Sequence, residues 1–151
     1  MDLWHFQWIL WIIAFALSGW LSWEDIRHRK ISLAPALGLP LVLITLSLFS
    51  DSLSPAWWFS HIAGASLPAS ILALGALQKK GGWGDVVIAF GYGWFVSFWG
   101  IGWWLLASIL PAWIEVLFSL AKGKKQPHIA FVSWISVGFW IWKIAVPLMP
   151  Y

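Results

Sequence analysis

Long apolar stretches separated by short polar connections run along the whole chain. A helix needs about 20 apolar residues to cross the hydrocarbon core of a bilayer. Hydropathy places candidate spans at residues 3–23, 33–50, 56–77, 86–99, 101–121 and 128–147. We therefore expect an all-α, polytopic membrane protein of about six transmembrane helices.

The fourth and fifth spans are the hardest to separate. Residues 86–121 are apolar almost throughout and are interrupted only by four glycines, Pro111 and Glu115. They could form two short spans joined by a tight turn at Gly100 and Gly102. They could equally form one long bent helix with an interfacial piece.

Composition supports the membrane interpretation. Hydrophobic residues make up 61% of the 151 positions and charged residues 10%, against about 25% charged in soluble proteins. This excludes a water-soluble fold and leaves no length for a separate soluble domain, so residues 1–151 are expected to form one integral membrane domain. The absence of cysteine excludes disulfides and thiolate chemistry within this chain.

Basic residues give the expected orientation, because lysine and arginine stay in cytoplasmic loops. Eight of the nine follow the first, third and fifth spans, and Lys143 is the exception. The eight are Arg27, Arg29, Lys30, Lys79, Lys80, Lys122, Lys124 and Lys125. Six spans with the N-terminus outside place all three loops on one side. The net charge of +3 forms no basic stripe, so a nucleic-acid partner is not expected.

Two aspartates meet the same cytoplasmic edge in this topology. Asp25 ends the first span and Asp85 opens the fourth. Each has an ordinary structural interpretation: Asp25 could pair with Arg27 or Arg29, and Asp85 could cap the N-terminus of its helix. Ionisable groups at membrane depth are nevertheless costly and commonly functional.

Helical spacing separates Asp25 from its neighbour Glu24. Positions three, four, seven and eleven before Asp25 are Ser22, Leu21, Ser18 and Ala14, a mostly small face suited to helix packing. The same steps before Glu24 give Leu21, Trp20, Leu17 and Ile13, a bulky face suited to lipid. Asp25 is therefore predicted to point into the bundle and Glu24 away from it.

Asp85 follows a glycine-rich segment, Gly81-Gly82-Trp83-Gly84-Asp85. Glycines let the backbone bend and approach other segments closely. A glycine-rich turn alone is a weak signal. It gains weight here because it delivers an aspartate to the edge that already holds Asp25.

These segments resemble the motifs of type IV prepilin peptidases and archaeal preflagellin peptidases, the GxGD membrane aspartyl proteases. Asp25-Ile-Arg27 with Ile31 is similar to the first aspartate motif, and Gly82-Trp83-Gly84-Asp85-Val86 is similar to the second. Gln126-Pro127-His128-Ile129-Ala130-Phe131 resembles the segment that opens the last span. The resemblance runs from the first span to the sixth. Ser32-Leu33 and Val87 depart from the usual flanking residues.

The resemblance implies an endopeptidase of the cytoplasmic membrane that cuts the leader of a prepilin-like protein after a glycine, at the cytoplasmic face. Asp25 and Asp85 would be the catalytic acids, with their individual roles left open and no cofactor. Gly82, Gly84, Glu24, Arg27 and Pro127 would support the motifs or contact the substrate. Glu24 could meet a leader lysine, although a solvated charge among basic neighbours is favoured. Without the N-terminal domain of the longer enzymes, no methyl transfer is expected.

Other functions remain open from the sequence. A small proton- or cation-coupled transporter could use the two aspartates, although its acids should lie near the midplane. A noncatalytic membrane component of pilus assembly would need neither of the two aspartates. His61 is placed about 36 Å from Asp85, so we expect it to pack or donate a hydrogen bond rather than assist the acids. The histidines lack metal-ligand spacing, and Ser66 has no activating histidine. The oligomeric state is not predicted.

Overall fold

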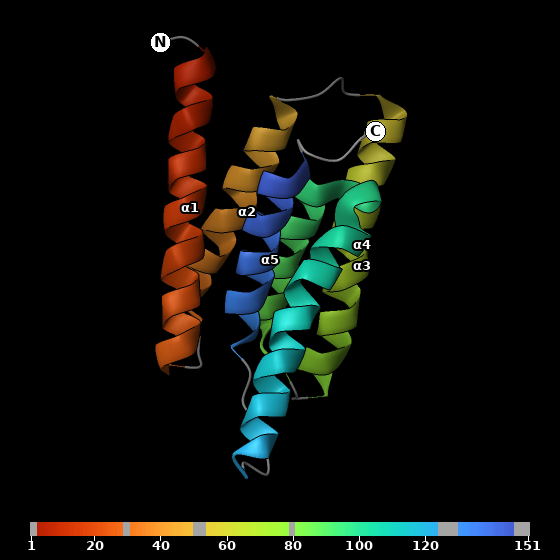
Figure 1. The fold of residues 1–151 in the computed structure, drawn as a ribbon. Helices are drawn as coiled ribbons and strands as arrows, with labels where there is room; N and C mark the ends of the chain where they lie inside the picture. Colours follow the sequence, from red (N-terminus) through yellow and green to blue (C-terminus); the bar gives the residue numbers. More distant parts are fainter. Residues whose placement is uncertain (1–2, 29–30, 50–53, 79–80, 124–129, 147–151) are drawn as a thin grey trace.

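The protein is all-α. The computed structural model describes residues 3–28, 31–49, 54–78, 81–123 and 130–146. These form five helices in the order α1 (Leu3–His28), α2 (Leu33–Leu48), α3 (Pro55–Leu77), α4 (Trp83–Ala121) and α5 (Phe131–Ala145). The helices lie side by side along one common direction (Figure 1). Three of them, α1, α3 and α4, are long and apolar enough to cross a membrane.

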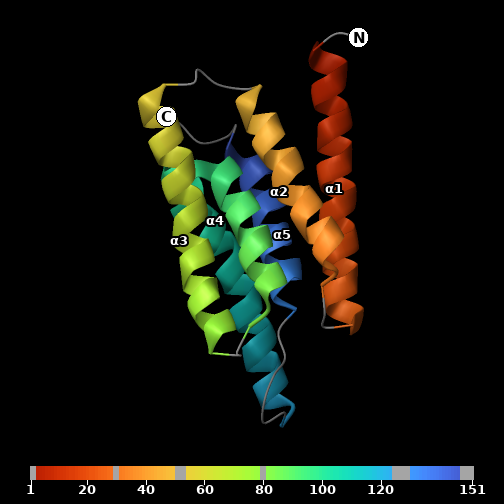
Figure 2. The ribbon, with the colours of Figure 1, turned by 180° about the vertical axis from the view of Figure 1, so that it is seen from behind.

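Helix α4 folds back on itself. Ser97 lies inside it with φ 61° and ψ 175°, which interrupts the helix. The rings of Tyr92 and Trp104 are 6.1 Å apart, whereas twelve residues of straight helix would separate them by about 18 Å. Figures 1 and 2 show the first part of α4 rising through the bundle and the second part returning. Residues 83–96 and 98–121 are thus two antiparallel helical segments.

This reversal corrects the expected position of the turn. The sequence pointed to Gly100 and Gly102, but the break lies three residues earlier, at Ser97. Gly102 has open space around its Cα, while a Cβ at Gly100 would lie 2.8 Å from Val96 and 2.9 Å from Trp142. Gly100 therefore serves close packing after the turn. The amide of Phe98, which starts the returning segment, donates to Ser60 Oγ of α3 at 3.3 Å.

Glycines let α4 lie at the centre of the bundle, where it packs against α2, α3 and α5. A Cβ on Gly93 would lie 2.3 Å from the carbonyl oxygen of Gly64 in α3. A Cβ on Gly91 would lie 2.8 Å from Pro40 in α2. The close approach leaves no room for a side chain at either glycine. Small residues bring membrane helices together in this way.

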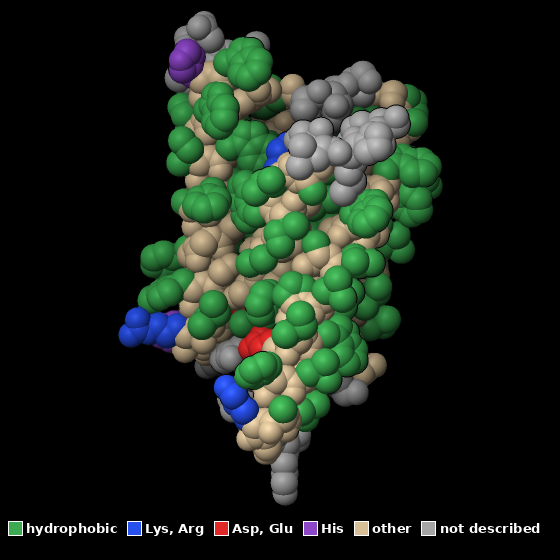
Figure 3. Space-filling view, in the orientation of Figure 1, with side chains coloured by type: hydrophobic (Ala, Val, Ile, Leu, Met, Phe, Trp, Pro, Cys, Tyr) green, Lys and Arg blue, Asp and Glu red, His purple; other side chains and the backbone are tan. Residues whose placement is uncertain are grey.

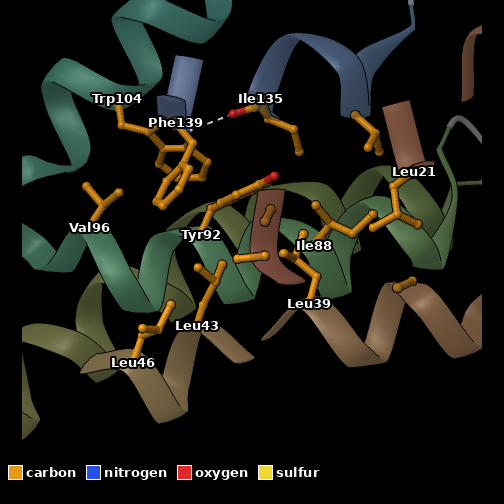
Figure 4. Packing of buried hydrophobic residues seen from close by; sticks show 14 of the residues in the cluster. Leu21, Leu39, Leu43, Leu46, Ile88, Tyr92, Val96, Trp104, Ile135 and Phe139 are labelled. Carbon is orange, nitrogen blue, oxygen red and sulfur yellow. Dashed lines mark hydrogen bonds between the residues drawn. The ribbon is translucent and has the colours of Figure 1, made fainter. Parts of the chain in front are cut away.

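A buried hydroxyl group joins three helices. The hydroxyl of Tyr92 in α4 lies 2.7 Å from Ser18 Oγ of α1 and 2.9 Å from Ser136 Oγ of α5. Figure 4 shows Tyr92 among the buried apolar side chains, with Trp104 Nε1 donating to the carbonyl of Ile135 at 3.1 Å. Hydrogen bonds of this kind hold helices together where apolar side chains face both lipid and neighbour.

The outer surface of the bundle is apolar. Figure 3 shows hydrophobic side chains along the length of the visible face, with basic side chains near its lower end. Large side chains such as Trp99, Phe59 and Trp4 expose 83%, 74% and 72% of their surface. Small and polar residues, in contrast, occupy interior positions. A lipid-facing helix shows this arrangement because hydrocarbon does not penalise exposed apolar side chains.

Replacing Ser97 by glycine is expected to stabilise the protein by about 1 kcal/mol. Its φ and ψ fall in a region that only glycine adopts readily, at a cost of about 1–3 kcal/mol for other residues. Part of this gain is offset by the larger chain entropy of glycine when unfolded. Thermal unfolding in detergent, followed by circular dichroism, measures the change. Ser97→Ala is the control, because it removes the hydroxyl and keeps the strain; equal stabilisation by both variants would contradict the explanation.

Candidate functional site

The end of α1 carries an inward-facing aspartate. Asp25 is 7% exposed, and Ala14, Ser18 and Leu21 on the same face are buried as well. Glu24 lies beside it on a different face and binds the next helix instead. The helical spacing of the sequence therefore predicted the direction of both carboxylates correctly.

Asp25 caps the N-terminus of α5, although Val132 in that helix lies 107 residues later in the sequence. Its Oδ2 accepts a hydrogen bond from the amide of Val132 at 2.9 Å and a longer one from Ser133 at 3.4 Å. These are the second and third residues of α5, whose own N-cap residue, Ala130, makes no side-chain cap hydrogen bond. A carboxylate is favoured at this position because the amides and the helix dipole present positive charge.

A second contact closes the same junction. The hydroxyl of Ser133 donates to the carbonyl oxygen of Ser22 in α1 at 3.1 Å. The end of α1 and the start of α5 are thus joined by the Asp25 carboxylate and by this hydroxyl. Arg27, one of the two arginines considered as ion-pair partners of Asp25, lies exposed with its guanidinium 5.2 Å from the centroid of the Trp23 ring. Arg29 lies outside the described residues.

Asp85 occupies the third position of α4. Its Oδ2 accepts a hydrogen bond from the amide of Gly82 at 3.1 Å, and its own amide donates to the carbonyl of Gly82 at 3.2 Å. Gly82, rather than Asp85, is the N-cap residue. Asp85 therefore fills the acidic position of a capping box rather than the expected N-cap position.

The two aspartates lie in neighbouring segments, and the charge of Asp25 acts on Asp85 less strongly than burial does. They come from different helices: Asp25 from the end of α1 and Asp85 from the start of α4. Both helix ends, together with the start of α5, lie at the lower end of the bundle in Figure 1. Two carboxylates can share one proton when they lie close enough to interact strongly.

The second glycine of the Gly82-Trp83-Gly84-Asp85 segment packs closely against another segment. A Cβ on Gly84 would lie 3.1 Å from Cβ of Ile31, which follows α1, and within 3.4 Å of two further Ile31 carbons. At Gly82 the nearest atom would be Asp85 Oδ2, at an ordinary 3.5 Å. Ile31 and Gly84 thus bring the two aspartate-bearing segments into direct contact.

Glu24 has a structural partner. Its carboxylate accepts hydrogen bonds from the amide of Ser32, at 2.8 Å, and from the Ser32 hydroxyl. Ser32 is the N-cap residue of α2. Glu24 therefore ties the end of α1 to the start of α2, which the sequence reasoning missed. Ser32 before an apolar run is a recognisable N-cap residue, but nothing in the sequence points to Glu24 as its partner.

The remaining candidates lie elsewhere or outside the described residues. Pro127 falls in the segment 124–129 and is not described. His61 is buried, and its Nδ1 lies 2.5 Å from the carbonyl oxygen of Trp94, which agrees with the expected hydrogen-bonding role. Ser66 is exposed on α3. Among the residues that the structure describes, no three histidine, cysteine or acidic side chains gather as a metal site.

Gly84→Ala is expected to be less stable than Gly102→Ala, because its added methyl group meets Ile31, which must shift to make room. Gly102→Ala is the matched control: it adds the same methyl group to the same helix, where nothing lies within 4 Å. Thermal unfolding in detergent compares the two.

The double variant Gly84→Ala/Ile31→Ala tests the contact directly. If the methyl group acts through Ile31, the two substitutions are expected to be non-additive, with the double variant more stable than the sum of the single changes predicts. Strict additivity would show that the Gly84 and Ile31 contact does not carry the effect.

Comparison with known proteins finds no match to this chain. The chain matches no protein-family model, no curated protein and no solved structure. A function for it must therefore be argued from its own residues.

Proposed function

We propose that this protein is a membrane aspartyl endopeptidase that removes the leader peptide of type IV prepilin-like proteins at the cytoplasmic face. One observation carries the proposal: the segments that hold Asp25 and Asp85 come from separate helices and are in contact at one end of an apolar helical bundle, through Ile31 and Gly84. The motif resemblance of the two segments supplies the reaction class. The contact between Ile31 and Gly84 supports it, because it joins those two segments.

The proposed topology has six membrane passes in a cytoplasmic membrane, with the N-terminus outside. Its support is the reversal of α4 at Ser97, which divides that helix into two antiparallel segments. Arg27 and Lys122, at the ends of α1 and α4, then belong to the same side as the aspartate pair. Basic side chains on that side agree with the positive-inside rule.

In the proposed reaction, one ionised carboxylate accepts a proton from a water molecule as the water oxygen attacks the carbonyl carbon of the scissile peptide. The other carboxyl group, protonated, donates to the peptide as the C–N bond breaks. Asp25 accepts from two backbone amides and Asp85 from one. These hydrogen bonds hold both carboxyl groups in place, and either aspartate can be the base in the proposed reaction.

The position of the pair also argues against a transporter. A transporter that carries protons or cations places its acids near the middle of the membrane. Asp25 lies in the last turn of α1 and Asp85 in the first turn of α4. Such a position suits a substrate whose leader lies in the cytoplasm and whose following helix lies in the membrane.

Asp25→Asn and Asp85→Asn are each expected to reduce cleavage of a co-expressed type IV prepilin by at least about 100-fold. Asparagine keeps an oxygen that can accept the amide hydrogen bonds that each carboxylate accepts, so both variants should insert and fold. The measurement is the gel shift between precursor and mature pilin, with membrane fractionation to confirm insertion. Cleavage retained in either variant would refute the catalytic role.

Glu115→Gln is the matched control for these variants. Glu115 accepts a hydrogen bond from Trp134 Nε1 at 2.5 Å, and glutamine keeps that acceptor while removing the charge. Cleavage is expected to continue in this variant. Asp25→Ala, by contrast, is expected to lose about 1 kcal/mol of stability as well as cleavage, because it also removes the cap of α5.

The six-pass topology can be tested with single cysteines, since the chain contains none. A membrane-impermeant maleimide is expected to label Trp99→Cys in intact cells. Arg27→Cys and Lys122→Cys are expected to react only after the membrane is permeabilised. Labelling of the Lys122 position from outside, with the Arg27 position protected, would indicate an odd number of passes between them and contradict the proposed topology.

A further inference from the structure

Two backbone groups at the reversal of α4 have partners on α3. In a regular α-helix the amide of residue 98 donates to the carbonyl of residue 94. Ser97, whose φ and ψ are not helical, lies within that turn. The amide of Phe98 donates to Ser60 Oγ at 3.3 Å. The carbonyl oxygen of Trp94 lies 2.5 Å from Nδ1 of His61. Adjacent side chains of α3 thus bind both ends of one helical hydrogen bond.

The contact with Trp94 determines which nitrogen of His61 carries a hydrogen. A carbonyl oxygen only accepts hydrogen bonds, so Nδ1 must be the donor. Neighbouring rings hold the imidazole in this orientation. Its centroid lies 4.0 Å from that of Trp57, one helical turn earlier, and 5.8 Å from that of Trp94. His61 is buried, and it is therefore an oriented donor to the backbone of α4.

The same face of α3 also carries Gly64. It follows His61 by three residues and Ser60 by four, and these spacings place side chains on one face of a helix. A Cβ at Gly64 would lie 2.6 Å from the carbonyl oxygen of Gly93 and 2.6 Å from the carbonyl carbon of Ser97. This close approach of α3 and α4, which lie side by side in Figures 1 and 2, brings Ser60 and His61 within hydrogen-bond distance of the break.

The pairing matters because a bilayer offers no water to a backbone group that its own helix leaves free. Insertion of a side chain into the hydrogen-bond ladder is one of the known causes of a sharp bend in a helix. Here one side chain accepts and its neighbour donates. A reversal at Gly100 or Gly102 would instead leave residues 94 and 98 inside a regular helix, where their backbone groups bond to each other.

We propose that Ser60 and His61 act together as positioning residues that hold the reversal of α4 at Ser97. Ser60 accepts from the amide and His61 donates to the carbonyl, so the pair replaces the helical hydrogen bond that the reversal removes. The inference concerns the path of α4 through the bundle and does not depend on the proposed peptidase activity. Asp25→Asn is expected to lose cleavage and to keep both contacts, so failure of either proposal is distinguishable from failure of the other.

A double-mutant cycle on the full chain in detergent tests the pair. Ser60→Ala and His61→Phe are each expected to lower Tm by roughly 2–10 °C, because each leaves one backbone group without its partner. Phenylalanine keeps a ring beside Trp57 and removes only the donor. The double variant is expected to lose less than the sum of the single losses, because the freed amide and carbonyl can then bond to each other. A double variant that loses the full sum, or single variants with unchanged Tm, would overturn the proposal.

Two further serine variants separate the hydrogen bond from a general effect of substitution in α3. Ser60→Thr keeps the hydroxyl and is expected to retain more of the wild-type Tm than Ser60→Ala. Ser66→Ala is the matched control, because Ser66 is exposed on the same helix, and its Tm is expected to stay unchanged. An equal loss in Ser66→Ala and Ser60→Ala would contradict the proposed role of the Ser60 hydroxyl.

The hydrogen on His61 can be located even if His61→Phe does not fold. The chain contains three other histidines, His5, His28 and His128, and replacing each of them by glutamine in turn assigns the remaining signal to His61. Nitrogen-15 NMR of the histidine-labelled protein in detergent then reports which ring nitrogen is protonated. We expect a hydrogen on Nδ1, with or without a second one on Nε2. A ring that is protonated on Nε2 alone would refute the donation to Trp94.

Discussion

The carboxylate of Asp25 is the interaction on which the rest of this structure depends. It supplies the cap that α5 lacks in its own sequence, and so it holds the last helix against the first. Since α5 also contacts α4 through Tyr92 and Ser136, the same contact fixes the position of Asp85 relative to Asp25. A residue proposed for chemistry is thus also a structural one, and its isosteric amide is the substitution that separates the two roles.

Much of the fold follows from the sequence. Hydropathy predicted the all-α fold and an overlapping apolar range for each described helix, although only three of the five helices are long and apolar enough to cross a membrane. Helical spacing put Asp25 inside and Glu24 outside, because the small residues three, four, seven and eleven positions before Asp25 define a packing face. The turn within α4 could not be located in this way. Gly100 and Gly102 were the obvious turn formers, but the chain breaks at Ser97, where close contact with Gly64 of α3 governs the backbone. Tertiary packing, rather than the local preference of glycine for turns, thus determines where α4 reverses.

The candidate site was only partly predictable for the same reason. Motif and topology brought Asp25 and Asp85 to one edge. Sequence could not show that Asp25 caps α5, that Ile31 covers Gly84, or that Ser32 engages Glu24, because each contact joins segments whose relative placement depends on the whole bundle. The structure therefore gives Glu24 and Gly84 roles that the sequence did not predict. Glu24 connects α1 to α2 by hydrogen bonds, and Gly84 lies where the two aspartate-bearing segments pack together.

The cap that Asp25 supplies to α5 also has a consequence for the order in which contacts form during synthesis. Asp25 is made early, whereas the amides of Val132 and Ser133 follow 107 and 108 residues later. At ordinary rates of synthesis, about 5–20 residues per second, the interval is on the order of 5–20 s. Throughout it the carboxylate has no helix to cap, and the aspartate pair lacks the support that α5 provides. The arrangement at Asp25 therefore becomes complete only after α5 has been made.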